Sequence, residues 1–144
     1  HPLKYFKSES FLKLYEARNL AIKKAKGKYL SFLDVDDFWE KDKIESQVKF
    51  LENNPHYKMV YSNYYTLNQT KKKKFLQNNY QLPSGNITKQ LLRRYTIGIL
   101  TVFLRRDIFE HQSFNKEYEI IGDFDFFVKL SSKIKIGCIQ KPLA

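Results

Sequence analysis

The sequence predicts an α/β fold, in which helices cover the faces of a sheet. Short apolar runs typical of buried strands alternate with segments of helical periodicity, turn residues separate the two, and aromatic side chains make up 16% of the chain. A chain of about this length buries roughly 68–70% of its unfolded surface, so 144 residues with 42% hydrophobic content allow one well-packed core. We therefore expect a single domain over residues 1–144.

A helix and a strand open the predicted fold. Residues 10–25 carry apolar side chains every three or four positions, and Gly27 is a typical C-terminal stop. The run 28–33 follows after a turn too short for anything but a helix-to-strand corner, and its apolar side chains indicate a buried strand.

A second helix and a second strand are expected after Trp39. The helix reaches about Glu52, because charged residues including Lys43 fall on one face and three apolar side chains share the other: Ile44, Val48 and Leu51. Residues 57–65 are rich in Val and Tyr, which favours a strand.

The middle of the chain is more polar. Residues 66–83 contain four consecutive lysines, Lys71 to Lys74, and are expected to form an exposed hairpin or loop. Asn86 is expected to cap a short helix that runs to Tyr95 and turns three apolar side chains inward: Ile87, Leu91 and Leu92.

The last third alternates between connections and apolar elements. Residues 99–104 read as a third strand and residues 114–121 as irregular. A helix is predicted over residues 123–130, and residues 134–139 form the last strand.

Three carboxylates follow directly on the first predicted strand, at Asp34, Asp36 and Asp37. If the chain stays extended, Asp34 and Asp36 share one face about 7 Å apart, where both can converge on a hard cation. The alternative is a helix N-cap with further acids in the first turn, and for Asp37 a helix cap is the expected role. The preceding strand favours a site, because it aims the acids at the carboxyl edge of a sheet, where α/β folds bind ligands.

The chain is strongly basic, with 26 Lys and Arg against 15 Asp and Glu and a net charge of +11. This charge favours nucleotide phosphates, acidic glycans, membrane phospholipid or nucleic acid as partners, without choosing among them. The single cysteine, Cys138, fits a reducing compartment and is expected to be a small buried hydrophobe. No apolar run approaches the roughly 18 residues that span a bilayer, so we expect a soluble, cytoplasmic protein with a peripheral contact at the inner face of a membrane.

The acidic stretch belongs to a longer pattern of motifs. Ala17-Arg18-Asn19 leads through Ala25-Lys26-Gly27-Lys28-Tyr29 into Phe32-Leu33-Asp34-Val35-Asp36-Asp37, and Gly122-Asp123-Phe124-Asp125 and Gln140-Lys141-Pro142 follow. This order resembles the family 2 glycosyltransferases of GT-A fold, in which an A-R-N helix, an A-x-G-x-Y turn and a strand ending in D-x-D precede an acidic motif at the acceptor-side helix. The resemblance implies a GT-A-like (Rossmann-like) mixed sheet flanked by helices.

The resemblance also implies a reaction. A sugar would move with inversion from a nucleotide diphosphate sugar to a glycan or lipid-linked acceptor, as in bacterial polysaccharide biosynthesis. Asp36 would hold Mn²⁺ or Mg²⁺ on the diphosphate, and Asp34 would face the ribose or the cation. Arg18 would place its planar guanidinium near the phosphates; its alternative role is a surface ion pair.

On the acceptor side, the resemblance makes Asp123 the general base that takes the proton from the attacking hydroxyl. Asp123 is equally suited to be the N-cap of the last helix, and the two roles are compatible. Asp125 lies two residues further and would point elsewhere, which makes it the weaker acceptor-side candidate. The Glu that usually precedes this Asp in the family is replaced here by Gly122.

Three further residues are acceptor-side candidates. Trp39 could stack on a sugar or line the acceptor pocket, or it could pack against the core as large aromatics commonly do. Thr96 and Gly98 precede the third strand, where the family places acceptor contacts; the alternative for this segment is a tight turn.

The resemblance to this family also implies a domain in two parts. The first part is a β-α-β-α-β unit that binds the nucleotide base. The sixteen residues before Ala17 are too few to supply that unit, so we expect the central and C-terminal part of a transferase domain, incomplete at both ends. A non-catalytic basic module that binds an anionic polymer through the lysine run is the alternative function. For that run, an acidic glycan or a membrane is favoured over nucleic acid.

Overall fold

A four-stranded mixed sheet organises the chain in the computed structural model, which describes residues 3–68 and 70–144. Its strand order is β1-β5-β2-β6, and its strands are β1 (Tyr29–Leu30), β2 (Met59–Asn63), β5 (Phe103–Arg105) and β6 (Ile136–Pro142). β5 runs antiparallel to both β1 and β2, whereas β2 and β6 are parallel. The carboxyl ends of β1, β2 and β6 therefore lie at the same edge of the sheet.

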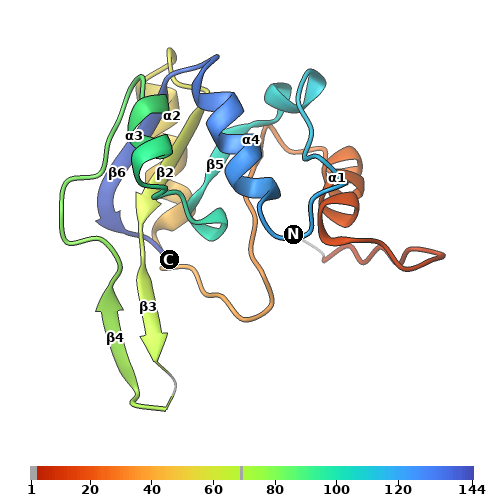
Figure 1. The fold of residues 1–144 in the computed structure, drawn as a ribbon, viewed down its shortest axis with the longest axis horizontal. Coiled ribbons are helices and arrows are strands. Elements are labelled where there is room, and N and C mark those ends of the chain that lie inside the picture. Colours follow the sequence, from red (N-terminus) through yellow and green to blue (C-terminus); the bar gives the residue numbers. More distant parts are fainter. Residues whose placement is uncertain (1–2, 69) are drawn as a thin grey trace.

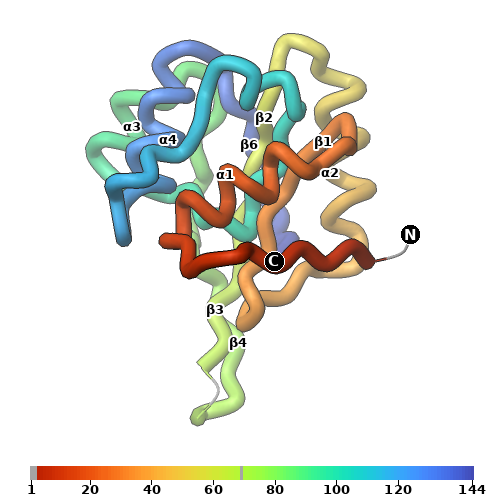
Figure 2. Tube along the Cα trace, turned by 90° about the vertical axis from the view of Figure 1, so that its right-hand side faces the viewer, coloured from red at the N-terminus to blue at the C-terminus, as the bar shows by residue number. Residues whose placement is uncertain are grey.

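Helices cover both faces of this sheet. α2 packs on one face, and α3 and α4 lie on the other, with α1 beside the sheet (Figures 1 and 2). The four helices are α1 (Leu14–Lys24), α2 (Lys43–Asn53), α3 (Thr88–Arg93) and α4 (Gly122–Ser131), and two short 3₁₀ helices span Ile99–Thr101 and Arg106–Glu110. The mixed sheet flanked by helices confirms the predicted fold class.

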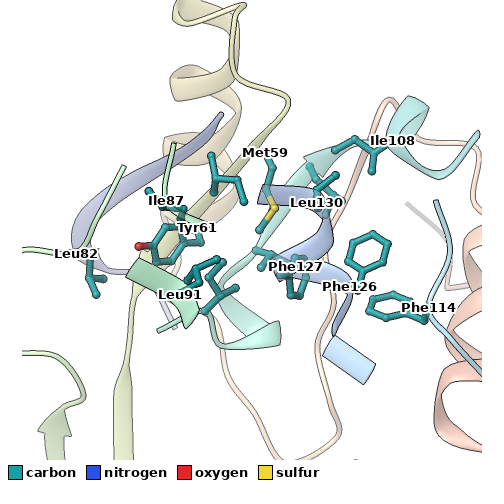
Figure 3. Packing of buried hydrophobic residues seen from close by; sticks show 14 of the residues in the cluster. Met59, Tyr61, Leu82, Ile87, Leu91, Ile108, Phe114, Phe126, Phe127 and Leu130 are labelled. Atoms are coloured by element: carbon teal, nitrogen blue, oxygen red, sulfur yellow. The ribbon is translucent and has the colours of Figure 1, made fainter. Parts of the chain in front are cut away.

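Alternation along β2 divides the core into two layers. Met59 and Tyr61 point into the larger cluster with the helix side chains Leu91, Phe127 and Leu130 (Figure 3). Val60, between them, packs in the opposite layer with Leu51 of α2 and Phe103 of β5. All five residues of β2 are buried, so this strand is the centre of the fold.

A hairpin of β3 (Tyr65–Asn68) and β4 (Lys73–Leu76) projects away from the body of the molecule (Figures 1 and 2). It confirms the exposed hairpin expected within residues 66–83. The backbone N–H of Tyr65 donates to the carbonyl of Ala144 at 2.8 Å, and that of Gln77 donates to the carbonyl of Tyr64 at 2.9 Å. These bonds anchor the base of the hairpin beside the carboxyl ends of β2 and β6.

Several predicted boundaries were wrong in instructive ways. β1 keeps only two residues of the run 28–33, because only Tyr29 and Leu30 pair with β5. The run 99–104 begins as a 3₁₀ turn and becomes a strand only at Phe103. α1 begins at Leu14, four residues after the predicted start.

The predicted cap of α3 was also wrong. The N-cap position is Ile87, and no side chain caps the helix. Ile87 and Leu91 are buried as expected, but Leu92 is 61% exposed. A helix of six residues turns only one narrow face towards the core, and Leu92 lies outside it. The irregular segment 114–121 contains no helix or strand, and the last helix and strand were predicted to within a few residues. No helix among the described residues is long and apolar enough to cross a membrane.

Candidate active site

A cleft of about 440 Å³ opens at the carboxyl edge of the sheet. One wall is the loop 36–40 that follows β1, the other is formed by residues 64–67 and Lys74 of the hairpin, and Leu100 and Ala144 complete the lining. Each segment leaves or approaches the sheet at the edge where three strands end, which is where α/β folds bind ligands. The position of the acidic stretch therefore agrees with the sequence prediction.

The acidic residues lie in a turn and not on an extended strand. The N–H of Asp37 donates to the carbonyl of Asp34 at 3.1 Å, which closes a turn over residues 35 and 36. The prediction that Asp34 and Asp36 share one face of a strand was therefore wrong. The turn instead directs Asp36 and Asp37 to the cleft, while Asp34 is held elsewhere.

Asp34 is held by Arg18. Arg18 Nη2 lies 3.1 and 3.0 Å from the two carboxylate oxygens, and its side chain is only 10% exposed. The guanidinium also lies 5.6 Å from the centre of the Tyr15 ring. Arg18 thus forms an ion pair, as its alternative role required; the guanidinium is largely buried, Asp34 remains 44% exposed, and the pair ties α1 to the acidic turn.

Asp36 and Asp37 have no such partner within residues 3–68 and 70–144. Partial burial, and then the negative charges of Asp36 and Asp34, raise the pKa of the Asp37 carboxyl above its usual range. Mutual repulsion of this kind marks a site that a cation would stabilise. The helix cap expected at Asp37 was wrong, since α2 begins only at Lys43 and its N-cap position is Asp42.

Asp123 lies in the first turn of α4 and is held by Tyr15 of α1. The Tyr15 hydroxyl donates to the carbonyl of Ile120 at 2.8 Å, accepts the N–H of Gly122 at 2.9 Å and lies 3.5 Å from Asp123 Oδ1. The N-cap position of α4 is Ile121, so Asp123 is not the predicted cap. Its Oδ1 instead accepts the N–H of Phe124 at 2.9 Å.

The Tyr15 ring leaves no room for a side chain at position 122, where the sequence has glycine. A Cβ atom there would lie 2.5 Å from the Tyr15 ring, far inside contact distance. A glutamate at this position would have to displace Tyr15, which explains why the chain departs from the family pattern.

Gly122→Ala is expected to destabilise the fold by about 1–3 kcal/mol, because the Tyr15 ring and the start of α4 must move apart. Urea unfolding measures the loss. In a Tyr15→Leu background the same substitution should cost clearly less, since the smaller side chain leaves room for the methyl group. An equal cost in both backgrounds would place the strain elsewhere.

Trp39 lies in the cleft and is fixed against the backbone. Its indole N–H donates to the carbonyl of Leu100 at 3.0 Å, which fixes the ring, and the ring lines the cleft. Behind it, the ammonium of the fully buried Lys43 lies 4.5 Å from the ring centre. Lys43 was wrongly assigned to the solvent face of its helix.

The remaining acceptor-side candidates lie outside the cleft. Thr96 is buried and its hydroxyl has no hydrogen-bond partner among the described residues. The carbonyl of Gly98 accepts the Thr101 N–H at 2.9 Å, which supports the tight-turn alternative. Asp125 pairs with Lys129 at 2.7 Å and lines a separate cavity, as expected of a side chain that points away from the acceptor site.

Sequence reasoning missed three residues that shape this region: Tyr15, Lys43 and Lys74. Tyr15 lies three positions before Arg18 on the same helix face, a spacing that could have indicated it. The lysines carried no such signal, because burial of Lys43 and the hairpin register of Lys74 depend on tertiary packing.

Known proteins resemble this chain over most of its length. The family model for Glycosyl transferase family 2 matches residues 1–112. An uncharacterized glycosyltransferase of Rickettsia conorii is 36% identical over 129 residues, which are 89% of this chain and 21% of that protein. The UDP-Glc:alpha-D-GlcNAc-diphosphoundecaprenol beta-1,3-glucosyltransferase WfgD of Escherichia coli is 34% identical over 98 residues, 68% of this chain and 37% of that protein. An uncharacterized glycosyltransferase of Methanocaldococcus jannaschii is 24% identical over 140 residues, 95% of this chain and 48% of that protein.

The chain spans about a fifth of the Rickettsia relative and less than half of the other two. Its mixed sheet with helices on both faces is consistent with the GT-A-like fold that the motifs imply. The family match covers the acidic turn, Arg18 and Trp39 together. On this evidence the chain belongs to glycosyl transferase family 2.

Proposed function

We propose that the chain transfers a sugar with inversion from a nucleotide diphosphate sugar to a glycan or lipid-linked acceptor, in a metal-dependent reaction. The observation that carries the proposal is the cleft at the sheet edge, where Asp36 and Asp37 have no ion-pair partner among the described residues. UDP-glucose is the first donor to test, because two Escherichia coli relatives are named as UDP-Glc-dependent glucosyltransferases.

The donor set at this turn fits Mn²⁺ or Mg²⁺. Both ions prefer hard oxygen ligands and commonly bind through one or two carboxylates plus substrate phosphates and water. Asp36, with Asp37 beside it in the cleft, would hold the ion through one or two carboxylates and leave its other coordination positions to a diphosphate and water. When bound, the ion would supply charge neutralisation on the departing diphosphate.

The chain's own side chains have distinct tasks in this proposal. Asp123 takes the proton from the acceptor hydroxyl as its oxygen attacks the anomeric carbon from the face opposite the leaving group. Tyr15 orients Asp123, and the Arg18–Asp34 pair holds α1 against the acidic turn. Trp39 provides an aromatic wall for the bound sugar. Peripheral contact with a membrane would bring a lipid-linked acceptor to this edge.

Binding of UDP-glucose tests the proposal, with Trp39 as the reporter since it is the only tryptophan in the sequence. Quenching of its fluorescence should require Mn²⁺, reverse with EDTA, and weaken by about tenfold or more in Asp36→Asn, the loss of one charge-assisted ligand. Asp107→Asn is the matched control, because Asp107 pairs with Lys58 at 2.9 Å outside the cleft. Metal-independent binding, or an equal loss in both variants, would contradict the mechanism.

A further inference from the structure

A buried cation lies behind one wall of the cleft and has no task in the proposed reaction. The side chain of Lys43 is completely buried, and its ammonium lies 4.5 Å from the centre of the Trp39 ring, which lines the cleft. No carboxylate among the described residues shifts its pKa. Because burying a charge without a counter-ion costs free energy, Lys43 is not explained as a stabilising ion pair.

Three acceptors surround this ammonium. Lys43 Nζ lies 2.6 Å from Gln47 Oε1, 3.0 Å from Ser31 Oγ and 3.5 Å from the carbonyl oxygen of Val102. An ammonium group has three N–H donors, so it can serve all three acceptors, whereas a neutral amine has only two donors. The protonated form therefore fits this site, with the face of the indole ring as a fourth contact.

The same side chains hold the short turn that supports Trp39. Three consecutive carbonyls of this turn accept side-chain hydrogen bonds: that of Leu100 from the Trp39 indole N–H at 3.0 Å, that of Thr101 from Gln47 Nε2 at 2.7 Å, and that of Val102 from the Ser31 hydroxyl. Leu100 lines the cleft beside Trp39. Since Gln47 and Ser31 both contact the Lys43 ammonium, one cation joins this wall of the cleft to the start of β5.

We propose that Lys43 is a positioning residue of the cleft, whose ammonium keeps the indole of Trp39 in the pose that contacts the sugar of the bound donor. The inference rests on the proposed function for its ligand, and it adds the residue that fixes the aromatic contact. It follows that the wall of the cleft is fully formed only while Lys43 carries its proton.

Other charged or titratable groups face Trp39 from both walls of the cleft. They are Asp36, Asp37 and Glu40 on its own loop, and Tyr64, Tyr65 and Lys74 on the hairpin side. Protonation of the carboxylates at low pH would weaken metal binding, which is opposite in sign to the effect of protonating Lys43. The hydroxyl, amide and carbonyl groups around the ammonium do not titrate. A variant without Lys43 keeps all six groups, so comparison with it isolates the contribution of Lys43.

Acrylamide quenching of Trp39 fluorescence tests the positioning without any ligand, because Trp39 is the only tryptophan in the sequence. Burial lowers the pKa of the Lys43 ammonium to about 7. In the unmodified chain the quenching constant should therefore rise by about twofold or more from pH 6 to 8.5, with its midpoint near that pKa, as the ring loses its cation. In Lys43→Met the constant should not vary with pH, because methionine does not titrate.

Ser31→Ala is a milder variant that leaves Lys43 and Trp39 in place. It removes one acceptor of the ammonium, which disfavours the charged form. The midpoint of the quenching transition should therefore move to lower pH by about one unit, the equivalent of one hydrogen bond to a charged group. A role for Lys43 in packing alone would leave this midpoint unmoved.

Lys41→Met is the matched control, since it removes the same charge from an exposed position two residues away. It should keep the transition of the unmodified chain. A quenching constant that is independent of pH in the unmodified chain would overturn the inference, and so would a transition of equal size in Lys43→Met.

Affinity for UDP-glucose in the presence of Mg²⁺ measures the consequence for the proposed function. It should fall by about threefold to tenfold from pH 6 to 8.5 in the unmodified chain, as expected for loss of a cation–aromatic contact, and this fall should be absent from Lys43→Met. An equal fall in both chains would contradict the inference. Absence of UDP-glucose binding at every pH would refute the donor site and leave the quenching result standing, so the two failures are distinguishable.

Discussion

Asp123→Asn is expected to lower the rate of sugar transfer by about 10²–10⁴, the usual contribution of a positioned general base. The amide keeps the shape of the side chain and can still accept the N–H of Phe124 through its oxygen, but it cannot take a proton. The rate is measured as UDP release from saturating UDP-glucose, with a membrane lipid extract as acceptor. Affinity for UDP-glucose should change by less than about twofold, because Asp123 does not line the cleft that holds Asp36.

Asp125→Asn provides the control for this experiment. Asp125 lies on the same helix, carries the same charge and pairs with Lys129 at 2.7 Å beside a different cavity. Its substitution should leave the rate within about twofold of the unmodified chain, since an i,i+4 pair on a helix contributes little. A comparable fall in both variants would show that the charge of the helix, and not the proton acceptor at position 123, sets the rate.

Tyr15 gives the role of Asp123 a structural basis. Its hydroxyl contacts the carbonyl of Ile120, the N–H of Gly122 and the carboxylate of Asp123 within 3.5 Å. The same side chain lies under the guanidinium of Arg18, which pairs with Asp34. One residue of α1 therefore connects the acidic turn with the start of α4, although more than a hundred residues separate Tyr15 from Asp123.

The sequence predicted the order of the elements well, because apolar periodicity and turn residues are local signals. The acidic turn and Trp39 were found for the same reason, since they follow directly on an apolar run. The predictions that were wrong concern features that depend on which other part of the chain packs against them. Three residues after Leu30 look like strand but do not pair with β5 in the described sheet.

α2 shows most clearly why burial could not be predicted from composition. The sequence placed Ile44, Val48 and Leu51 inward, yet Ile44 is 41% exposed, and the buried positions are Lys43, Gln47 and Leu51. The helix is rotated because Gln47 donates to the carbonyl of Thr101 at 2.7 Å and Lys43 Nζ lies 3.0 Å from Ser31 Oγ. Backbone groups left unpaired at the start of β5 thus determine which side of α2 faces the sheet.

Lys43→Met is expected to change how stability depends on pH between pH 6 and 9. Burial lowers the pKa of the Lys43 ammonium from 10.5 to about 7, and no carboxylate pairs with it among the described residues. Below pH 7 both the folded and the unfolded chain are protonated at this position. Between pH 7 and 10.5 only the unfolded chain holds the proton, so Lys43 makes the free energy of unfolding rise with pH by up to about 1.4 kcal/mol per unit.

Methionine removes this contribution because it does not titrate. The stability of Lys43→Met minus that of the unmodified chain should therefore be largest at pH 6 and fall steadily towards pH 9, whatever the constant cost of leaving Gln47 and Ser31 without the ammonium. Urea unfolding at pH 6, 7, 8 and 9 measures this difference in the free energy of unfolding. The contributions of the other titrating groups are common to both chains and cancel. Lys41→Met removes the same charge from an exposed position two residues away and is the matched control. A flat difference for Lys43→Met would mean that the buried amine keeps its proton. That result would make Lys43 a permanent cation behind Trp39, held by Ser31, Gln47, the carbonyl of Val102 and the indole ring.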